Sequence, residues 1–298
     1  MSVKTDNFST HDLDNFRQHQ RRSFATLIEV GHTLKEGETE VQVARRIRKA
    51  FHEQGVHHYF HVPVALFGER TTYPGDFGEF EALATDKKLE TGMPVILDAA
   101  PIYDGHLVDT SLPFSFGENT VMDQMTRDLQ PFRSFIKDSV NAGKTFQAIE
   151  LEVNDMINDL GYLNCHRKHI GAVLGHRVMR VKNRPWNRLK IKQLGVRQVG
   201  WFYWKSILAK KGWQNESPNW NQYKTSNHAP FHGLWAVEPH FAKDGVGTKF
   251  EEILVITEQG AEWLDEDLPH TRFWNGQPML GSIDHTNVGW ATRCPPTN

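Results

Sequence analysis

Two aspartates, Asp98 and Asp109, lie in extended runs on either side of a turn. An apolar run precedes the turn signal Tyr103-Asp104-Gly105 and a second extended run follows it, so the sequence predicts a β-hairpin. A loop at Tyr103-Asp104 places Asp98 opposite Asp109, because cross-strand partners then sum to 207, whereas a loop at Asp104-Gly105 makes them diagonal neighbours. In both registers the carboxylates lie about 5 to 8 Å apart on one face. Next to apolar residues this is costly unless a cation lies between them, and the alternative is two solvated acids on a wet face.

A second acidic pair follows the same pattern near the C-terminal end. Asp244-Gly245 separates two apolar runs, and Asp-Gly is a strong signal for a two-residue hairpin loop. With that loop, cross-strand partners sum to 489, which places Glu238 opposite Glu251. The two hairpins together carry four negative charges, which two divalent cations would neutralise. The pattern therefore predicts a two-metal site.

Two histidines are candidates to join these carboxylates. His169 and His176 flank an apolar segment that contains glycine. A histidine among polar residues is more often a surface or hydrogen-bonded residue than a ligand. Close to organised carboxylates the ligand interpretation gains weight, because oxygen-rich sites for Mn, Fe, Co or Zn commonly include an imidazole.

The elements that must position these residues are helices and strands in mixed order. Apolar spacing predicts helices over 11–33, 39–55, 121–142 and 145–160, and a strand over 59–67. Thr39 is the expected N-cap of the second helix, with Gln42 at the capping-box position. An α+β fold follows from this order.

Composition bounds the class of protein. The 298 residues are 39% hydrophobic and 23% charged with a formal net charge of −2, which is typical of a globular protein without a global electrostatic partner. No apolar run approaches the roughly 18 residues of a membrane span, and no secretory signal is visible. Two cysteines, Cys165 and Cys294, make no disulfide framework. The default expectation is a cytoplasmic protein with no membrane partner.

The stretch 181–230 differs in composition from the rest of the chain. It contains ten Lys or Arg against one acid, Glu216, with tryptophans interleaved. A single-strand nucleic-acid groove has this composition, but Gly and Pro interrupt the run and no nucleic-acid motif accompanies it. We favour an ordered insertion that packs its aromatics over the site, and a third interpretation is that its cations steer an anionic substrate. The tail over 265–298 is predicted to wrap the surface as an extension.

The chain from about residue 35 to residue 264 resembles the pita-bread metallohydrolases, which include methionine aminopeptidases, aminopeptidase P, prolidase and creatinase. The resemblance implies a curved antiparallel sheet flanked by helices, as a single catalytic domain over 1–298 without the N-terminal domain of prolidase. Five stretches carry it in the family's order: 35–44, the two aspartates eleven residues apart, the two histidines seven apart, Val237-Glu238-Pro239, and 251–260.

The resemblance implies a role for each candidate ligand. Asp98 would chelate one metal, and Asp109 and Glu251 would bridge two. His169 and Glu238 would hold the second. The implied cofactors are two divalent ions of Mn, Fe, Co or Zn, which at about 3.5 to 4 Å apart acidify a bridging water and polarise a carbonyl.

The resemblance also implies two catalytic residues and a class of substrate. Glu238 is the candidate for proton transfer, and His176 would steady the substrate carbonyl or the developing oxyanion. Glu252 follows Glu251 directly on a strand and should point to the opposite face. The implied function is hydrolysis of a small peptide or amide, as in aminopeptidase P and prolidase. A homodimer is compatible with it.

Several residues depart from the family's pattern. The family's peptidases usually carry a histidine about 17 to 21 residues before the first aspartate, but 77–81 contains none, and His57, His58 and His61 lie too far back to carry over. Arg177 stands where an acid usually follows the second histidine. These departures keep a metal-dependent lyase acting on a small zwitterion as the alternative, with a metal-free binding module as a third class.

Overall fold

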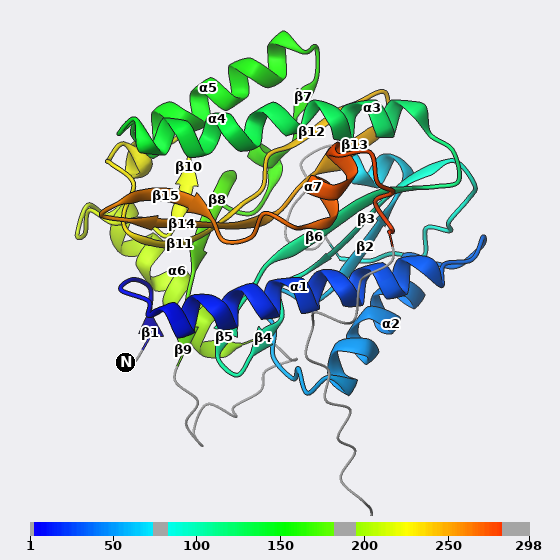
Figure 1. Ribbon diagram of the computed structural model, residues 1–298, viewed down its shortest axis with the longest axis horizontal. Helices are drawn as coiled ribbons and strands as arrows, with labels where there is room; N and C mark the ends of the chain where they lie inside the picture. Colours follow the sequence, from blue (N-terminus) through cyan, green and yellow to red (C-terminus); the bar gives the residue numbers. More distant parts are fainter. Residues whose placement is uncertain (1–2, 74–82, 182–194, 282–298) are drawn as a thin grey trace, which may run out of the picture.

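The computed structural model describes residues 3–73, 83–181 and 195–281 of the chain. Antiparallel sheets lie between helices α3, α4 and α5 on one side and α1 and α2 on the other (Figure 1). The helices are α1 (Thr10–His32), α2 (Glu40–Glu53), α3 (Thr120–Asp128), α4 (Gln130–Asn141), α5 (Phe146–Asp159), α6 (Val196–Lys210) and α7 (Pro269–Trp274), with short 3-10 turns η1 (Gly68–Thr72), η2 (His166–Lys168) and η4 (Lys224–Ser226). The expected α+β class is confirmed.

Four sheets make up the β structure. The largest has the order β10-β8-β11-β14-β15, and the others are β2-β3-β6, β13-β12-β7 and β1-β9-β5-β4. Their bounds are β1 (Val3–Lys4), β2 (Val64–Phe67), β3 (Met93–Ala99), β4 (Ile102–Tyr103), β5 (His106–Leu107), β6 (Thr110–Phe116), β7 (Leu163–Asn164), β8 (Val173–Val178), β9 (Arg180–Val181), β10 (Asn219–Asn221), β11 (Gly233–Val237), β12 (His240–Lys243), β13 (Val246–Lys249), β14 (Glu252–Thr257) and β15 (Gly260–Trp263).

Two apolar cores hold the sheets against the helices. One contains side chains of α1, α2, β2 and β3, and the other contains side chains of α3, α4, α5, β11 and β14. Burial of this kind is the main force that fixes the sheets in place. Among the described residues, none of the helices combines the length and the hydrophobicity that a membrane span requires.

The helix predictions are confirmed with small changes. Thr39 caps α2, and the capping box with Gln42 is present. The segment expected as one helix over 121–142 is two helices, because α3 ends at Asp128 and α4 starts with a proline in its first turn. The expected strand over 59–67 is shorter and begins at Val64.

The registers of both acidic hairpins follow from their turns. Asp104 and Gly105 both have positive φ, so they form the loop, and Asp98 pairs with Ser111. Of the two registers considered, the diagonal one is therefore present. In the second hairpin His240 pairs with Lys249 and Val237 with Glu252, both of which sum to 489. That register is confirmed.

Two segments outside the acidic hairpins differ from the expected picture. Within the stretch expected as an insertion, β10 is an edge strand of the largest sheet, and Trp220 is fully buried against Phe146. Residues 182–194 of that stretch lie outside the described residues. Within the expected C-terminal extension, α7 contributes the buried His270, so it is packed into the protein rather than laid over its surface.

Candidate metal centre

The two acidic hairpins meet at a single buried point. A bridge between Ser111 and Glu251 joins the β3-β6 hairpin to the strand that continues into β14. The carboxylates of Asp98, Asp109, Glu238 and Glu251 are all buried there, with no more than 6% of any residue exposed. Because buried carboxylates need compensating charge, the cations that surround them define the chemistry of the site.

A lysine lies among three of these carboxylates. Lys249 Nζ is 2.7 Å from Asp98 Oδ2, 2.9 Å from Glu238 Oε2 and 3.1 Å from Glu251 Oε2. Its side chain is only 2% exposed. One ammonium group therefore joins acids from both hairpins.

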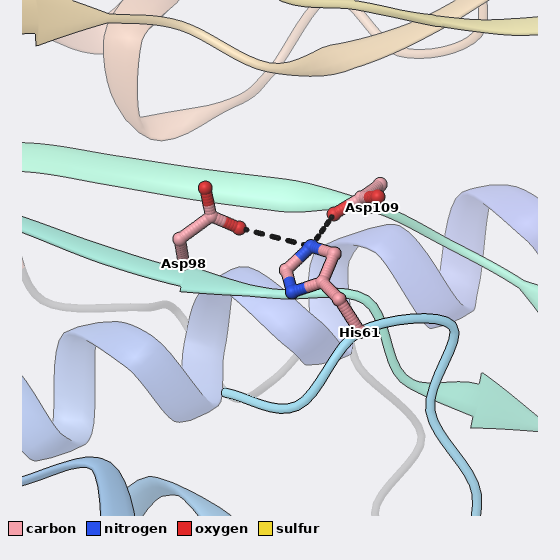
Figure 2. A group of neighbouring side chains, drawn as sticks. All are labelled: His61, Asp98 and Asp109. Carbon is pink, nitrogen blue, oxygen red and sulfur yellow. Dashed lines mark hydrogen bonds and ion pairs between the residues drawn. The ribbon is translucent and has the colours of Figure 1, made fainter. Parts of the chain in front are cut away.

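Two histidines contact the fourth carboxylate, that of Asp109. His61 Nε2 is 3.1 Å from Asp109 Oδ1 and 3.4 Å from Asp98 Oδ1, and Figure 2 shows its ring pointing between these two side chains. His176 Nε2 is 3.2 Å from Asp109 Oδ2 and 4.0 Å from Glu251 Oε1. Asp109 thus receives one imidazole at each oxygen.

His169 lies at the far side of Glu238. Its Nδ1 is 2.9 Å from Glu238 Oε2, and its Nε2 is 3.0 Å from Nδ1 of the buried His240. His240 Nε2 in turn is 2.7 Å from the backbone oxygen of Thr71, which fixes that nitrogen as the donor. The ring of Tyr73 packs against both imidazoles. A chain of polar contacts therefore runs from Glu238 into the protein.

Burial and neighbouring charges oppose each other in the pKa values of these groups. Burial alone lowers the pKa of Lys249 and of His61, but the surrounding carboxylates outweigh it, raising the first well above its usual range and the second to about 9. Burial and the charge of Asp109 raise the pKa of Glu251 well above its usual range. Burial would raise the pKa of Glu238, but the charges of His169 and Lys249 lower it instead. Glu251 is thus the carboxyl that holds a proton most readily without a further cation.

Aromatic rings cover the His176 side of the cluster. Phe60 stacks on His176 with ring centres 5.4 Å apart, and Phe202 of α6 approaches the same imidazole edge-on at 5.9 Å. Phe60 and Phe202 also contact each other. The expected basic and aromatic stretch therefore does reach the candidate site, through one helix.

The donor set fits a divalent metal ion. Donor atoms of Asp109, His176 and Glu251 lie within 4.8 Å of one another, and so do those of His61, Asp98 and Asp109. Among the described residues, the buried Oδ1 of Asp98 has no hydrogen-bond partner. Carboxylate oxygens with imidazole nitrogens suit Mn, Fe, Co or Zn.

The structure brings all the sequence-predicted residues together, but not in equal roles. Asp98, Asp109 and Glu251 fall in the two donor groups, and His176, expected to contact substrate, falls there too. Among the described residues, His169 and Glu238 contact each other outside those groups. Glu252 points away, as expected, and pairs with Arg133 and His270.

Sequence reasoning missed His61, Lys249 and His240. His61 lies too far back along the chain to match the family's histidine, but the loop before β2 returns it to the carboxylates. Lys249 carried a usable signal, because it precedes Glu251 by two positions on extended chain and so shares its face. His240 carried the matching signal, since it is the cross-strand partner of Lys249.

The profile of metallopeptidase family M24 matches residues 14–258. The chain belongs to metallopeptidase family M24. No curated protein sequence matches it.

Solved structures of this family share the fold. An X-Pro aminopeptidase from Thermotoga maritima MSB8 is 16% identical with a TM-score of 0.62, over 88% of this chain and 62% of that chain. A Xaa-Pro dipeptidase from Bacillus anthracis is 17% identical with a TM-score of 0.60, over 87% of this chain and 62% of that chain. A prolidase from Pyrococcus horikoshii OT3 is 16% identical with a TM-score of 0.60, over 86% of this chain and 62% of that chain. The M24 chain therefore has the pita-bread fold and spans less than two thirds of the length of these proteins.

Proposed function

We propose that this M24 chain is a divalent-metal-dependent hydrolase of a small peptide or amide. The observation that carries the proposal is the meeting of Asp98, Asp109, His176 and Glu251 as buried donors in a chain of this family. The names of the structural neighbours, X-Pro aminopeptidase and prolidase, support a short peptide as the substrate class.

The chain's own residues divide the work of the site. Asp109, His176 and Glu251 would hold an ion, with Asp98 and His61 beside it. The bound metal would acidify a water molecule and polarise the scissile carbonyl. Glu238, which the charges of His169 and Lys249 keep ionised, is placed to accept a proton. Phe60 and Phe202 would exclude water on the His176 side.

Removal of a single ligand charge tests the proposal. Asp109→Asn and Glu251→Gln should each lower kcat/KM on a cleaved dipeptide or N-acyl amide by at least about 100-fold, because a neutral amide is a poor metal ligand. The measurement is turnover by purified protein supplied with Mn, Co or Zn, with bound metal counted in the same samples. Glu258→Gln, in the turn after β14, is the control and should retain activity. Full activity in either ligand variant would contradict the assignment.

A lyase remains the second candidate, because residues 77–81, where the family's peptidases usually have a histidine before the first aspartate, contain none. A metal-held carboxylate could then take a proton from carbon instead of activating water for hydrolysis. A screen of dipeptides, N-acyl amides, and sulfonium and betaine compounds separates the two. Elimination without hydrolysis of any amide would favour the lyase.

A further inference from the structure

The ammonium group of Lys249 lies between the two acidic hairpins, where the buried carboxylates need a positive charge. Its Nζ contacts three carboxylates that come from three separate chain positions, at 2.7 to 3.1 Å. A lone ammonium normally lies at the surface, since burial without partners is costly. Here three acids stabilise it, and it in turn neutralises part of their charge.

The carboxylate oxygens divide into two sets around this ammonium. Lys249 uses Oδ2 of Asp98, Oε2 of Glu238 and Oε2 of Glu251. The other oxygens of Asp98 and Glu251 face His61 and His176, together with Asp109. Among the described residues, Asp98 Oδ1 is buried without a hydrogen-bond partner. The first set of oxygens therefore contacts a cation that belongs to the protein. The second set is available to bind an ion from solution.

The strand that carries Lys249 is held in place. Gly247 of β13 donates its backbone N–H to Thr71 Oγ1 at 2.9 Å, and a Cβ at this glycine would lie 2.0 Å from the backbone oxygen of Thr71. With β12 paired on its other edge, β13 leaves little freedom for the lysine to withdraw. The backbone that carries Lys249 is therefore anchored next to the site.

We propose that the Lys249 ammonium replaces one of the two metal ions, so that this chain binds a single divalent ion at Asp109, His176 and Glu251. The inference rests on the proposed function, since it assumes that the site binds metal. A second divalent ion would have to share three oxygens with a positive charge at hydrogen-bond distance, and close like charges in a poorly solvated site repel strongly. One ion and one lysine together supply three positive charges to the four carboxylates.

The test is a count of bound metal. Wild-type protein, stripped with chelator and then dialysed against Mn²⁺, Co²⁺ or Zn²⁺, should hold one ion per chain by mass spectrometry and by calorimetric titration. Lys249→Met should hold two, a doubling, because removal of the ammonium frees three carboxylate oxygens. Lys243→Met, an exposed lysine on the same hairpin, is the matched control and should hold one.

Stability without metal gives a second readout that does not depend on activity. Stripped Lys249→Met should unfold at a lower temperature than stripped wild type, because buried carboxylates lose their cation. Added metal should raise its unfolding temperature more than it raises that of the wild type. Lys249→Gln serves in the same role if Lys249→Met does not fold.

The outcomes separate this inference from the function on which it rests. Two ions per chain in the wild type, or one ion per chain in a folded Lys249→Met or Lys249→Gln variant, would overturn the role of the lysine and leave a metal-dependent hydrolase intact. No specific binding of any of the three metals by wild type would overturn both. The wild-type count decides even if neither lysine variant folds.

Discussion

His61 enters the acidic cluster from the loop that precedes β2. The family's peptidases usually supply a histidine shortly before the first aspartate, which this sequence lacks, so His61 provides an imidazole from a different chain position. Its ring lies 3.1 Å from Asp109 and 3.4 Å from Asp98, and 38% of its side chain is accessible to solvent. A partly exposed imidazole beside buried carboxylates is suited to meet an ion or a substrate as it arrives.

Replacement of His61 should weaken metal binding without unfolding the protein. His61→Ala removes an imidazole that contacts two of the carboxylates. The expected effect is a roughly 10- to 100-fold rise in the Kd for Mn²⁺ or Zn²⁺, the range found when a group beside a metal ligand is lost. Competition with a metal-sensitive dye measures that Kd. His57→Ala, an exposed residue of the same loop, should leave Kd unchanged, and an equal Kd in both variants would show that His61 takes no part.

At the residue scale, the turn residues made the positions of the four acids predictable, whereas His61 was not predictable because an irregular loop positions it. Asp-Gly loops fix the register, and the register alone brings Glu238 opposite Glu251. His61 depends on how an irregular loop folds back, for which the sequence carries no periodic signal. Lys249 could have been predicted from its two-residue offset to Glu251, but basic residues on strands are usually solvent-facing.

At the scale of elements, an ion pair ties the helical layer to the strand that carries a candidate ligand. Arg133 of α4 reaches Glu252 of β14 with two contacts, at 2.7 and 3.1 Å, while Glu252 is fully buried. His270 of α7 contacts the same carboxylate at 3.1 Å. Since Glu252 is adjacent to Glu251, these contacts also orient the strand at the metal centre.

Removal of the arginine should destabilise the fold. Arg133→Met leaves Glu252 with His270 but without its bidentate partner, and we expect a loss of about 3 kcal/mol in the free energy of unfolding, the usual consequence of breaking a buried pair. Urea unfolding followed by circular dichroism measures it. Lys137→Met on the same helix is the control, because its contact with Asp138 is long and partly exposed. A loss below about 1 kcal/mol for Arg133→Met would contradict the structural role.

The stretch that contains helix α6 and β10 shows that composition alone did not predict which aromatic residues lie at the site and which lie in a core. The basic and aromatic stretch was expected to cover the site, and Phe202 does contact His176. The same stretch also supplies β10, whose Trp220 packs into a core. Basic and aromatic composition cannot distinguish the two, because tryptophan packs equally well in a core or over a pocket.

At the scale of the whole molecule, the class of fold was predictable because helix and strand periods alternate clearly along the chain. Caps such as Thr39 and turns such as Asp244-Gly245 set the boundaries of the elements. The placement of α7 was not predictable in this way. Its position depends on contacts of His270 and Trp274 with Phe250, which lies just before β14 in the chain.

Acid sensitivity is a property of the whole molecule that one half-buried histidine makes testable. His19 of α1 stacks on Tyr103 with ring centres 4.8 Å apart. Burial, followed by the charges of His106 and Arg22, lowers its pKa to about 4, with Asp104 opposing them. Unfolded histidine has a pKa near 6.5, so as the pH falls from about 6.5 to 4 the unfolded chain takes up this proton before the folded chain does. The stability that neutral His19 allows is therefore present above about pH 6.5 and is lost as the pH falls through that window.

His19→Phe should reduce this loss, because phenylalanine keeps the stacking on Tyr103 and takes up no proton. The measurement is the free energy of unfolding by urea at pH 7.5 and at pH 5.0, both with chelator so that metal binding does not change with pH. Between pH 7.5 and pH 5.0, the free energy of unfolding should fall more for wild type than for His19→Phe. Two fully buried histidines, His106 and His166, also have lowered pKa values, so part of the acid loss should remain in the variant. His11→Phe, an exposed position on the same helix, should lose as much as wild type. Equal losses in wild type and His19→Phe would show that the protonation of His19 does not contribute to acid unfolding.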